Sequence, residues 1–248
     1  MWQKLVSWLV GLLGLVTMGK LPATVSPTPA PDPPKSVEID AGKFEYRYFT
    51  VSGDEGLGLV YNYANKIAAE DLIKAYGCTK AINGGFYDLD SSPLGLVISD
   101  FRQLADNRPN KLFDGYLYVT REGRAGIAEK PVYANVKDEV QTGPVLVVNG
   151  REKAMTSTLR PARRMVAVEQ ANGQMVFMTV FVANSRLDGP ALSDLAKAVL
   201  EIGEGEGWSI DRAINLDGGS ASVFFDGHDL IGELQPVGSL WCVKKSNK

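Results

Sequence analysis

The chain has 248 residues, a formal net charge of −3, 45% hydrophobic residues and 22% charged residues. This length suits one substantial core, and the composition is that of an ordinary globular protein. Lysine and arginine are scattered rather than clustered, so no nucleic-acid partner is expected.

The first 21 residues form an export-type segment. Lys4 precedes an apolar run from Leu5 to Gly19 that is interrupted only by Ser7 and Thr17. A basic start before such a run is typical of a secretory signal, and the run is shorter than the ~20 residues of a comfortable membrane span. Because no clear cleavage site follows, an uncleaved membrane anchor is the alternative, with a buried core helix as a third. Both exported readings predict a periplasmic or extracellular protein.

A proline-rich stretch, residues 22–36, follows the export-type segment. Proline fixes φ and lacks an amide donor, so the stretch predicts an extended spacer that contributes nothing to a core. Residues 37–248 are then the expected folded domain.

Short apolar segments alternate with turns through this domain. Two amphipathic helices are expected at 65–76, ending at Gly77, and at 191–202. Asn149-Gly150 and Asn172-Gly173 each predict a hairpin. The expected strands are 44–51, 57–63, 94–99, 115–120, 124–129, 145–148, 164–169, 175–182, 214–216 and 221–225. This pattern predicts a single α+β domain, with the two main helices covering a mostly antiparallel sheet.

Cys78 and Cys242 are the chain's two cysteines. In an oxidising compartment they could pair across a long loop, and two separate buried thiols are the alternative. Pairing needs Cα atoms within about 7 Å, which sequence does not determine.

A glycine-rich turn, Asn215-Leu216-Asp217-Gly218-Gly219-Ser220-Ala221-Ser222, lies between two apolar segments. Glycine permits close approach of a ligand to the backbone, and a carboxylate at a strand end could act as acid or base on a bound sugar. Taken alone, Asp-Gly-Gly is equally an ordinary tight turn.

Three other segments carry comparable chemistry. Asn83-Gly84-Gly85 runs into Phe86-Tyr87, aromatic residues that could stack on a sugar or pack in the core. In Gln141-Thr142-Gly143-Pro144 a hydroxyl stands beside a backbone fixed by proline. Arg160 and Arg163-Arg164 precede a predicted strand, and the planar fork of arginine suits phosphate oxygens, although a solvated basic turn would use the same residues.

In this order and spacing, the four segments together with Pro93–Asp100 resemble the phosphodiester glycosidase family over about residues 40–243. The resemblance implies hydrolysis of a sugar-1-phosphodiester on the sugar side, which leaves a free sugar and a phosphomonoester. The family usually has three glycines after the aspartate, so either Ser220 or Ser222 takes the hydroxyl role. Its arginine strand usually carries a glycine where Ala167 stands.

The resemblance and the chemistry together nominate the site. Asp217 is expected to activate water or stabilise an oxocarbenium-like centre, with Asp88 or Asp90 as the partner carboxylate. Arg163, or in another register Arg164, is expected to hold the phosphate while glycine amides add donors. The catalytic candidates are Asp217, Asp88, Ser220 and Ser222, and the substrate-binding candidates are Asn83, Gly84, Gly85, Thr142, Gly143, Arg163, Arg164, Asn215, Gly218 and Gly219.

No cofactor is assigned to this site. One histidine, His228, and two distant cysteines make a zinc site a poor expectation, whereas an oxygen-only Ca²⁺ or Mg²⁺ site near Asp88, Asp90 and Asp217 stays open. The expected partner is a glycan, such as an exopolysaccharide, or a sugar phosphate. The alternatives are a non-catalytic envelope carbohydrate-binding or polysaccharide assembly protein, and an acyl hydrolase, which the lack of Gly-X-Ser-X-Gly disfavours.

Overall fold

The computed structural model describes residues 35–154 and 160–246. The export-type segment at 1–21 and the proline-rich stretch up to residue 34 therefore lie outside the described residues. Within the described ranges, no helix is both long and apolar enough to cross a membrane.

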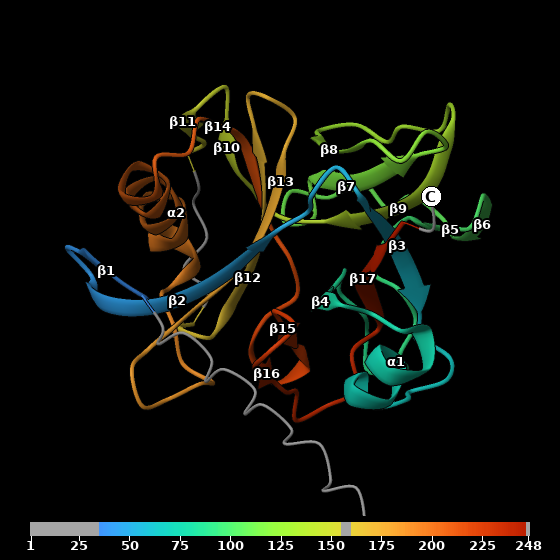
Figure 1. The fold of residues 1–248 in the computed structure, drawn as a ribbon, viewed down its shortest axis with the longest axis horizontal. Coiled ribbons are helices and arrows are strands. Elements are labelled where there is room, and N and C mark those ends of the chain that lie inside the picture. Colours follow the sequence, from blue (N-terminus) through green and yellow to red (C-terminus); the bar gives the residue numbers. More distant parts are fainter. Residues whose placement is uncertain (1–34, 155–159, 247–248) are drawn as a thin grey trace, which may run out of the picture. The chain divides into compact units, whose positions relative to one another are not determined.

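The described strands form three antiparallel sheets (Figure 1). The first has the order β1 (Lys35–Ile39), β2 (Gly42–Thr50), β13 (Met175–Phe181), β12 (Arg164–Gln170), β14 (Ile210–Asn215), β10 (Val145–Val148) and β11 (Arg151–Glu152). The second has the order β16 (Leu230–Ile231), β15 (Phe224–Phe225), β4 (Lys80–Asn83), β17 (Ser239–Lys245) and β3 (Glu55–Tyr61). The third has the order β6 (Arg102–Ala105), β5 (Val97–Ser99), β9 (Val136–Thr142), β7 (Gly115–Thr120) and β8 (Ala125–Ala128).

A single hydrophobic core is shared by the inner faces of all three sheets. Phe177 from the first sheet, Trp241 from the second and Leu117 from the third are fully buried members of it. Side chains alternate across a strand, so the outer faces need their own cover. In β12, Met165 and Ala167 enter this core, while Val166 and Val168 point to the opposite face.

The two α-helices cover two different outer faces. Helix α2 (Leu192–Glu206) packs Leu195 and Val199 against the outer face of the first sheet. Helix α1 (Ala69–Tyr76) packs Leu72 and Ile73 against the outer face of the second sheet. The third sheet carries a small apolar cluster on its outer face, and no residue of either helix belongs to it.

The predicted fold class, an α+β domain with two main helices covering one mostly antiparallel sheet, is therefore wrong. The described residues are mostly β, in three antiparallel sheets with two α-helices. The pattern of apolar segments located most strands but did not show which of them share a sheet. Because the sheets bury one another's inner faces, the helices cover only outer faces.

Local signals in the sequence were more accurate than the fold class. β10 pairs with β11 across Asn149-Gly150, and β12 pairs with β13 across Asn172-Gly173, which confirms both predicted hairpins. Helix α1 ends at Gly77, whose φ of 64° is left-handed, as expected of a glycine stop. It begins at Ala69 rather than residue 65 because the carbonyl of Asn62 accepts the N–H groups of Asn65 and Lys66 in a turn.

β9 was not predicted, because its sequence, Val-Lys-Asp-Glu-Val-Gln-Thr, lacks an apolar face. Apart from Lys137, its polar side chains are nevertheless buried, and several of them hold the backbone of neighbouring loops. Asp138 accepts the N–H of Asp100 at 2.9 Å, and Glu139 accepts the N–H of Val132 at 2.8 Å. Polar residues in a strand thus serve loop attachment here rather than solvent exposure.

Cys78 and Cys242 form a disulfide, with Cα atoms 5.3 Å apart. The bond joins the segment after α1 to β17, which lies between β4 and β3 in the second sheet. Pairing, rather than two separate thiols, is therefore the outcome for these cysteines.

Replacing both cysteines by alanine is expected to lower stability by about 2–5 kcal/mol, because the bond closes a long loop in the unfolded chain. For a chain of this size, the melting temperature should fall by roughly 4–20 °C. Thermal unfolding with and without reductant checks this: reductant should lower the wild-type transition and leave the double variant unchanged. A wild-type transition insensitive to reduction would contradict the expectation.

Candidate active site

The four segments singled out in the sequence meet at one place. The turn after β14 is joined to the end of β4 by the N–H of Asp217, which donates to the carbonyl of Gly84 at 3.1 Å. The same turn is joined to the start of β12 by the N–H of Gly219, which donates to the carbonyl of Arg163 at 2.9 Å. The fold thus assembles around the glycine turn residues that lie far apart in the chain.

Asn83 and Gly84 brace the Asp217 turn from the side of β4. Asn83 is buried; its Nδ2 donates to the carbonyl of Asp217 at 2.8 Å and its Oδ1 accepts the N–H of Val223 at 3.0 Å. A Cβ at Gly84 would collide with Ser239 Oγ, so only glycine fits there. Both residues therefore hold the turn and do not line a cavity.

Thr142, Gly143 and Asn215 form a second brace, between β9 and β14. Thr142 Oγ1 donates to the carbonyl of Asn215 at 2.9 Å, and Asn215 Nδ2 donates to the carbonyl of Gly143 at 2.9 Å. Thr142 and Asn215 are both almost fully buried. These predicted substrate-binding residues accordingly connect two sheets beneath the turn.

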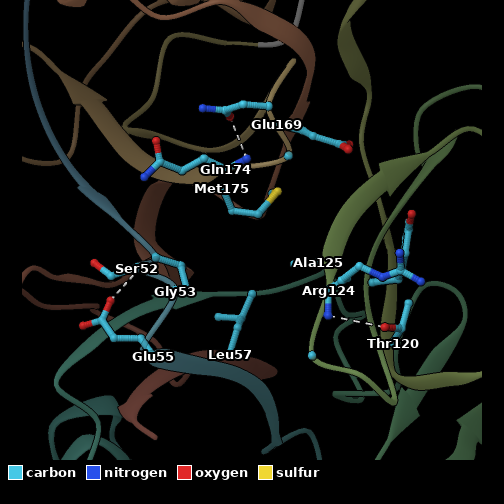
Figure 2. A pocket seen from close by; sticks show the side chains of 15 residues that line it. Ser52, Gly53, Glu55, Leu57, Thr120, Arg124, Ala125, Glu169, Gln174 and Met175 are labelled. Atoms are coloured by element: carbon cyan, nitrogen blue, oxygen red, sulfur yellow. Dashed lines mark hydrogen bonds between the residues drawn. The ribbon is translucent and has the colours of Figure 1, made fainter.

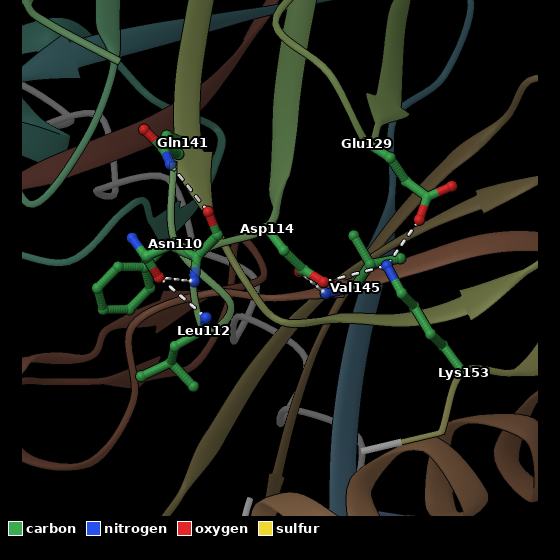
Figure 3. A network of polar contacts seen from close by, with 8 residues as sticks. Asn110, Leu112, Asp114, Glu129, Gln141, Val145 and Lys153 are labelled. Carbon is green, nitrogen blue, oxygen red and sulfur yellow. Dashed lines mark hydrogen bonds and ion pairs between the residues drawn. The ribbon is translucent and has the colours of Figure 1, made fainter. Parts of the chain in front are cut away.

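Gln141 anchors a loop beside this brace (Figure 3). Its Nε2 donates to the carbonyls of Arg108 and Phe113 at 2.7 and 2.9 Å, and its Oε1 accepts the N–H groups of Leu96 and Arg108, both at 3.0 Å. The anchored loop brings the Phe113 ring to within 4.6 Å of the Phe86 ring, measured between centroids. Phe86 therefore packs in the protein rather than facing a ligand.

Arg163 lies inside the protein, 1% exposed. Its Nε donates to Ser222 Oγ at 2.9 Å, its Nη1 to the carbonyl of Arg186 at 2.8 Å, and its Nη2 to the carbonyls of Ser222 and Gly232. Ser222 Oγ in turn donates to the carbonyl of Gly219 at 2.6 Å. Its guanidinium is therefore bound to the loop that carries Arg186 and to the segment after the glycine turn.

Arg164 is the first residue of β12 and is also buried. Its Nε donates to the carbonyl of Pro190 at 3.0 Å and its Nη2 to the carbonyl of Arg160 at 2.6 Å. A Cβ built at Gly218 would lie 3.9 Å from Arg164 Nη1. Arg164 Nη1 therefore lies next to the backbone of the glycine turn.

A cleft of about 450 Å³ opens over the glycine turn. Four predicted site residues line it: Asp217, Gly218, Ser220 and Asp88. The remaining lining residues come from the turn after β3, the 87–91 turn, the end of the glycine turn and the segment before β17: Asn62, Tyr63, Lys66, Tyr87, Leu89, Ser91, Ala221, Gln235, Pro236, Val237 and Gly238.

Asp217 is the carboxyl at the floor of this cleft. Burial raises its pKa from 3.8 to about 8, although the Gly218 N–H, which donates to Asp217 Oδ1 at 2.8 Å, lowers it. A carboxyl that titrates this close to neutral pH, in a cleft, has the property expected of a proton-transfer group.

Two tyrosines stand beside Asp217. Tyr63 is buried, its hydroxyl lies 3.3 Å from Ser239 Oγ, and its ring meets the Tyr87 ring edge-on at 6.4 Å. Burial raises the pKa of both phenols, and the charge of Asp217 raises them further. Tyr87, whose hydroxyl donates to the carbonyl of Pro236 at 2.9 Å, presents a ring that suits contact with a sugar.

Lys66 supplies the positive charge of the cleft. Of the described residues that line it, Lys66 is the one with a cationic side chain. Its backbone has φ 51°, a left-handed conformation fixed by the turn that Asn62 organises. The sequence offered no motif for Tyr63 or Lys66, because they follow β3, more than 140 residues before Asp217.

The other predicted catalytic groups are placed as follows. Asp88 lines the cleft, is exposed, and accepts the N–H of Leu89 at 2.7 Å, whereas Asp90 does not line the cleft. Ser220 is exposed, with Oγ 3.4 Å from Gln235 Oε1. Among the hydrogen bonds of the described residues, neither Ser220 nor Ser222 contacts His228, so no serine–histidine pair forms.

Two cavities larger than the cleft, of about 730 and 750 Å³, lie elsewhere. The first is lined by the turns at the opposite end of the β12–β13 hairpin, with Glu169 and Gln174 on one side and Arg124 on another (Figure 2). No predicted site residue lines either cavity. The predicted site residues converge at Asp217, in the smaller cleft.

Residues 35–154 and 160–246 hold no group of three or more His, Cys, Asp or Glu side chains that could bind a metal ion. Asp88, Asp90 and Asp217 thus do not form a cluster of three carboxylates in these residues.

A family model described as phosphodiester glycosidase matches residues 76–244. This range includes the glycine turn, both braces and Arg163. No curated protein matches the chain.

Solved structures share the fold at low sequence identity. The catalytic domain of zebrafish N-acetylglucosamine-1-phosphodiester alpha-N-acetylglucosaminidase, auto-inhibited by its pro-peptide, has a TM-score of 0.64 and 15% identity over 85% of this chain and 81% of that chain. A hypothetical protein from Synechocystis has a TM-score of 0.59 and 15% identity over 85% of this chain and 61% of that chain. A Burkholderia pseudomallei protein described as exported has a TM-score of 0.51 and 12% identity over 81% and 74%.

Asp217→Asn is expected to stabilise the fold at neutral and alkaline pH. Because the folded-state pKa is raised from 3.8 to about 8, the folded protein binds a proton that the unfolded chain releases, and stability is lost as pH rises from about 4 to 8. Asparagine removes that loss, so the variant should exceed wild type at pH 8 and approach it near pH 4.

Urea unfolding at pH 4, 6 and 8 measures this difference. Asp71→Asn, on the exposed side of α1, serves as the matched control for removing a carboxylate. An Asp217→Asn variant less stable than wild type at pH 8 would show that the carboxylate is well accommodated in the fold.

Proposed function

The chain belongs to the phosphodiester glycosidase family, and from this premise we propose that it hydrolyses a sugar-1-phosphodiester on the sugar side, in an envelope or extracellular glycan. The observation that carries the proposal is the Asp217 carboxyl, whose pKa is raised to about 8 at the floor of a cleft that also contains Tyr63, Tyr87 and Lys66.

The chemistry of the substrate sets what the cleft must supply. Water attacks the anomeric carbon, the bond from that carbon to the phosphate oxygen breaks, and a phosphomonoester leaves with the bonding electrons. Phosphate is already a good leaving group and does not need a general acid. The protein therefore has to accept a proton from water and bind the phosphate's charge.

Asp217 accepts the proton from water in this proposal. For a pKa of about 8, roughly one carboxyl in ten is ionised at pH 7, and the ionised form is a stronger base than an ordinary aspartate. The same ionised form would stabilise positive charge at the anomeric carbon. Both roles predict activity that rises with pH.

Lys66 binds the phosphate in this proposal, in place of Arg163. The Arg163 guanidinium is hydrogen-bonded inside the protein, and the N–H groups of Gly84, Gly218 and Gly219 donate to protein oxygens. Lys66 is the cationic side chain that remains in the cleft. The Tyr87 ring then contacts the sugar, and Asp88 lines the same cleft as the second carboxylate.

Export is part of the proposal. A disulfide persists in oxidising compartments outside the cytoplasm. The Cys78–Cys242 bond therefore supports a periplasmic or extracellular location for the protein. The apolar segment at 1–21 supports the same location, as a signal or as an anchor.

Asp217→Asn is expected to lower kcat by about 10²- to 10⁴-fold on glycosyl 1-phosphodiesters, because the amide cannot accept a proton. Wild-type kcat/KM should rise with pH and level off near pH 8. Release of sugar and phosphomonoester from a panel of hexose 1-phosphodiesters measures both. Sugar-phosphate binding without hydrolysis would favour a non-catalytic carbohydrate-binding protein, and unimpaired hydrolysis in the variant would remove Asp217 from the mechanism.

Lys66→Gln is expected to raise KM about 5- to 30-fold, because a partly exposed charged contact to the phosphate is lost. The effect should shrink at high salt, which screens exposed charges. Lys43→Gln, an exposed lysine on β2, is the matched control and should leave KM unchanged. An equal KM in the Lys66 variant and wild type would place the phosphate elsewhere.

A further inference from the structure

Two exposed leucines belong to segments that border the cleft: Leu89 lines it, and Leu234 directly precedes Gln235, which lines it. Leu89 is 101% exposed and Leu234 is 70% exposed, the two highest values for large hydrophobic side chains in the described residues. Ile67, beside Lys66, is 40% exposed. Single exposed apolar residues are common on proteins, but here each lies at or next to a residue that lines one cleft, which favours a binding surface there.

Leu89 contributes nothing visible to the fold. The turn that carries it is closed by backbone bonds, from the N–H of Asp88 to the carbonyl of Ser92 at 2.9 Å and from the N–H of Ser91 to the carbonyl of Asp88 at 2.8 Å. The Leu89 side chain extends past these bonds into solvent, although Leu89 also lines the cleft. The turn is thus built to present an apolar side chain at this opening.

Leu234 belongs to the segment that borders the cleft at the glycine turn. Its N–H donates to the carbonyl of Ser220 at 2.8 Å, and the next residues, Gln235 and Pro236, line the cleft. Leu89 and Leu234 therefore come from two separate segments that border one opening.

We propose that the aglycone on the phosphate side of the substrate is apolar, an alkyl or isoprenoid chain of a lipid phosphate. This rests on the proposed function. With the sugar at Asp217 and Tyr87 and the phosphate at Lys66, the other half of the diester leaves through the mouth. There it contacts Leu89 and Leu234, whose apolar surface is removed from water only when such a chain is bound.

Charges at the mouth favour a single lipid chain over an anionic membrane surface. Asp88 and Asp90 flank Leu89, and both are exposed. These two carboxylates would be repelled by anionic lipid headgroups, whereas the one phosphate of the substrate lies at Lys66. The apolar mouth therefore binds the chain of the molecule that occupies the cleft.

The test compares octyl and glyceryl diesters of the same hexose 1-phosphates. Wild type should show a kcat/KM ratio, octyl over glyceryl, of at least tenfold, and Leu89→Ser/Leu234→Ser should bring the ratio near one. Leu104→Ser replaces a leucine on β6 that is 42% exposed and does not line the cleft, and this control should keep the wild-type ratio. A wild-type ratio near one, or a ratio that survives the double substitution, would overturn the proposal.

Product binding separates this proposal from the proposed function. Calorimetric titration with octyl phosphate and with glycerol phosphate measures the apolar contact without hydrolysis. Leucine-dependent octyl phosphate binding with no diester cleaved would sink the proposed function and keep the apolar mouth. Hydrolysis with no preference for the octyl diester would keep the proposed function and overturn the proposal of an apolar aglycone. Self-association that the double substitution abolishes, with no octyl preference, would show that a second copy covers the leucines.

Discussion

The buried guanidinium of Arg163 is the interaction on which the site depends. A charge taken out of water must be fully hydrogen-bonded, and here the partners are the carbonyls of Arg186, Ser222 and Gly232 together with Ser222 Oγ. One side chain at the start of β12 thereby fixes two loops, including the whole segment after the glycine turn. The floor of the cleft and the wall that carries Leu234 both follow from this attachment.

The sequence identified residues that the fold brings together at the candidate site. It did not identify the role of each residue there. Asn, Thr, Gly and Arg are the residue types that bind sugar phosphates, and they are also the types that satisfy a buried turn. Asn83, Thr142 and Asn215 could not be assigned to either role before their burial was known. Asp217 is distinguishable by its raised pKa, which depends on surroundings that no motif records. Tyr63 and Lys66 escaped notice because a turn after a distant strand carries them.

The fold shows the same limit. Hairpins and the glycine stop after α1 depend on local backbone preferences and were predictable. The division into three sheets depends on which faces bury each other, and β12 is apolar on both of its faces. β9 departs from the usual pattern of a strand. Asp138, Glu139 and Gln141 are buried polar side chains that bind backbone groups of loops, and neither helix covers the sheet that contains them. A strand of this kind has the composition of a loop.

The disulfide has a consequence for how the protein responds to proteases. Every brace of the glycine turn, from Asn83 to Arg163 and Asn215, lies between Cys78 and Cys242. A protease that cuts one peptide bond inside this covalent ring produces two fragments that stay tethered as one molecule. The halves of the nicked chain cannot diffuse apart, so the hydrogen bonds that brace the glycine turn can re-form after a cut. Damage by proteases then becomes permanent only after a second cut or after reduction.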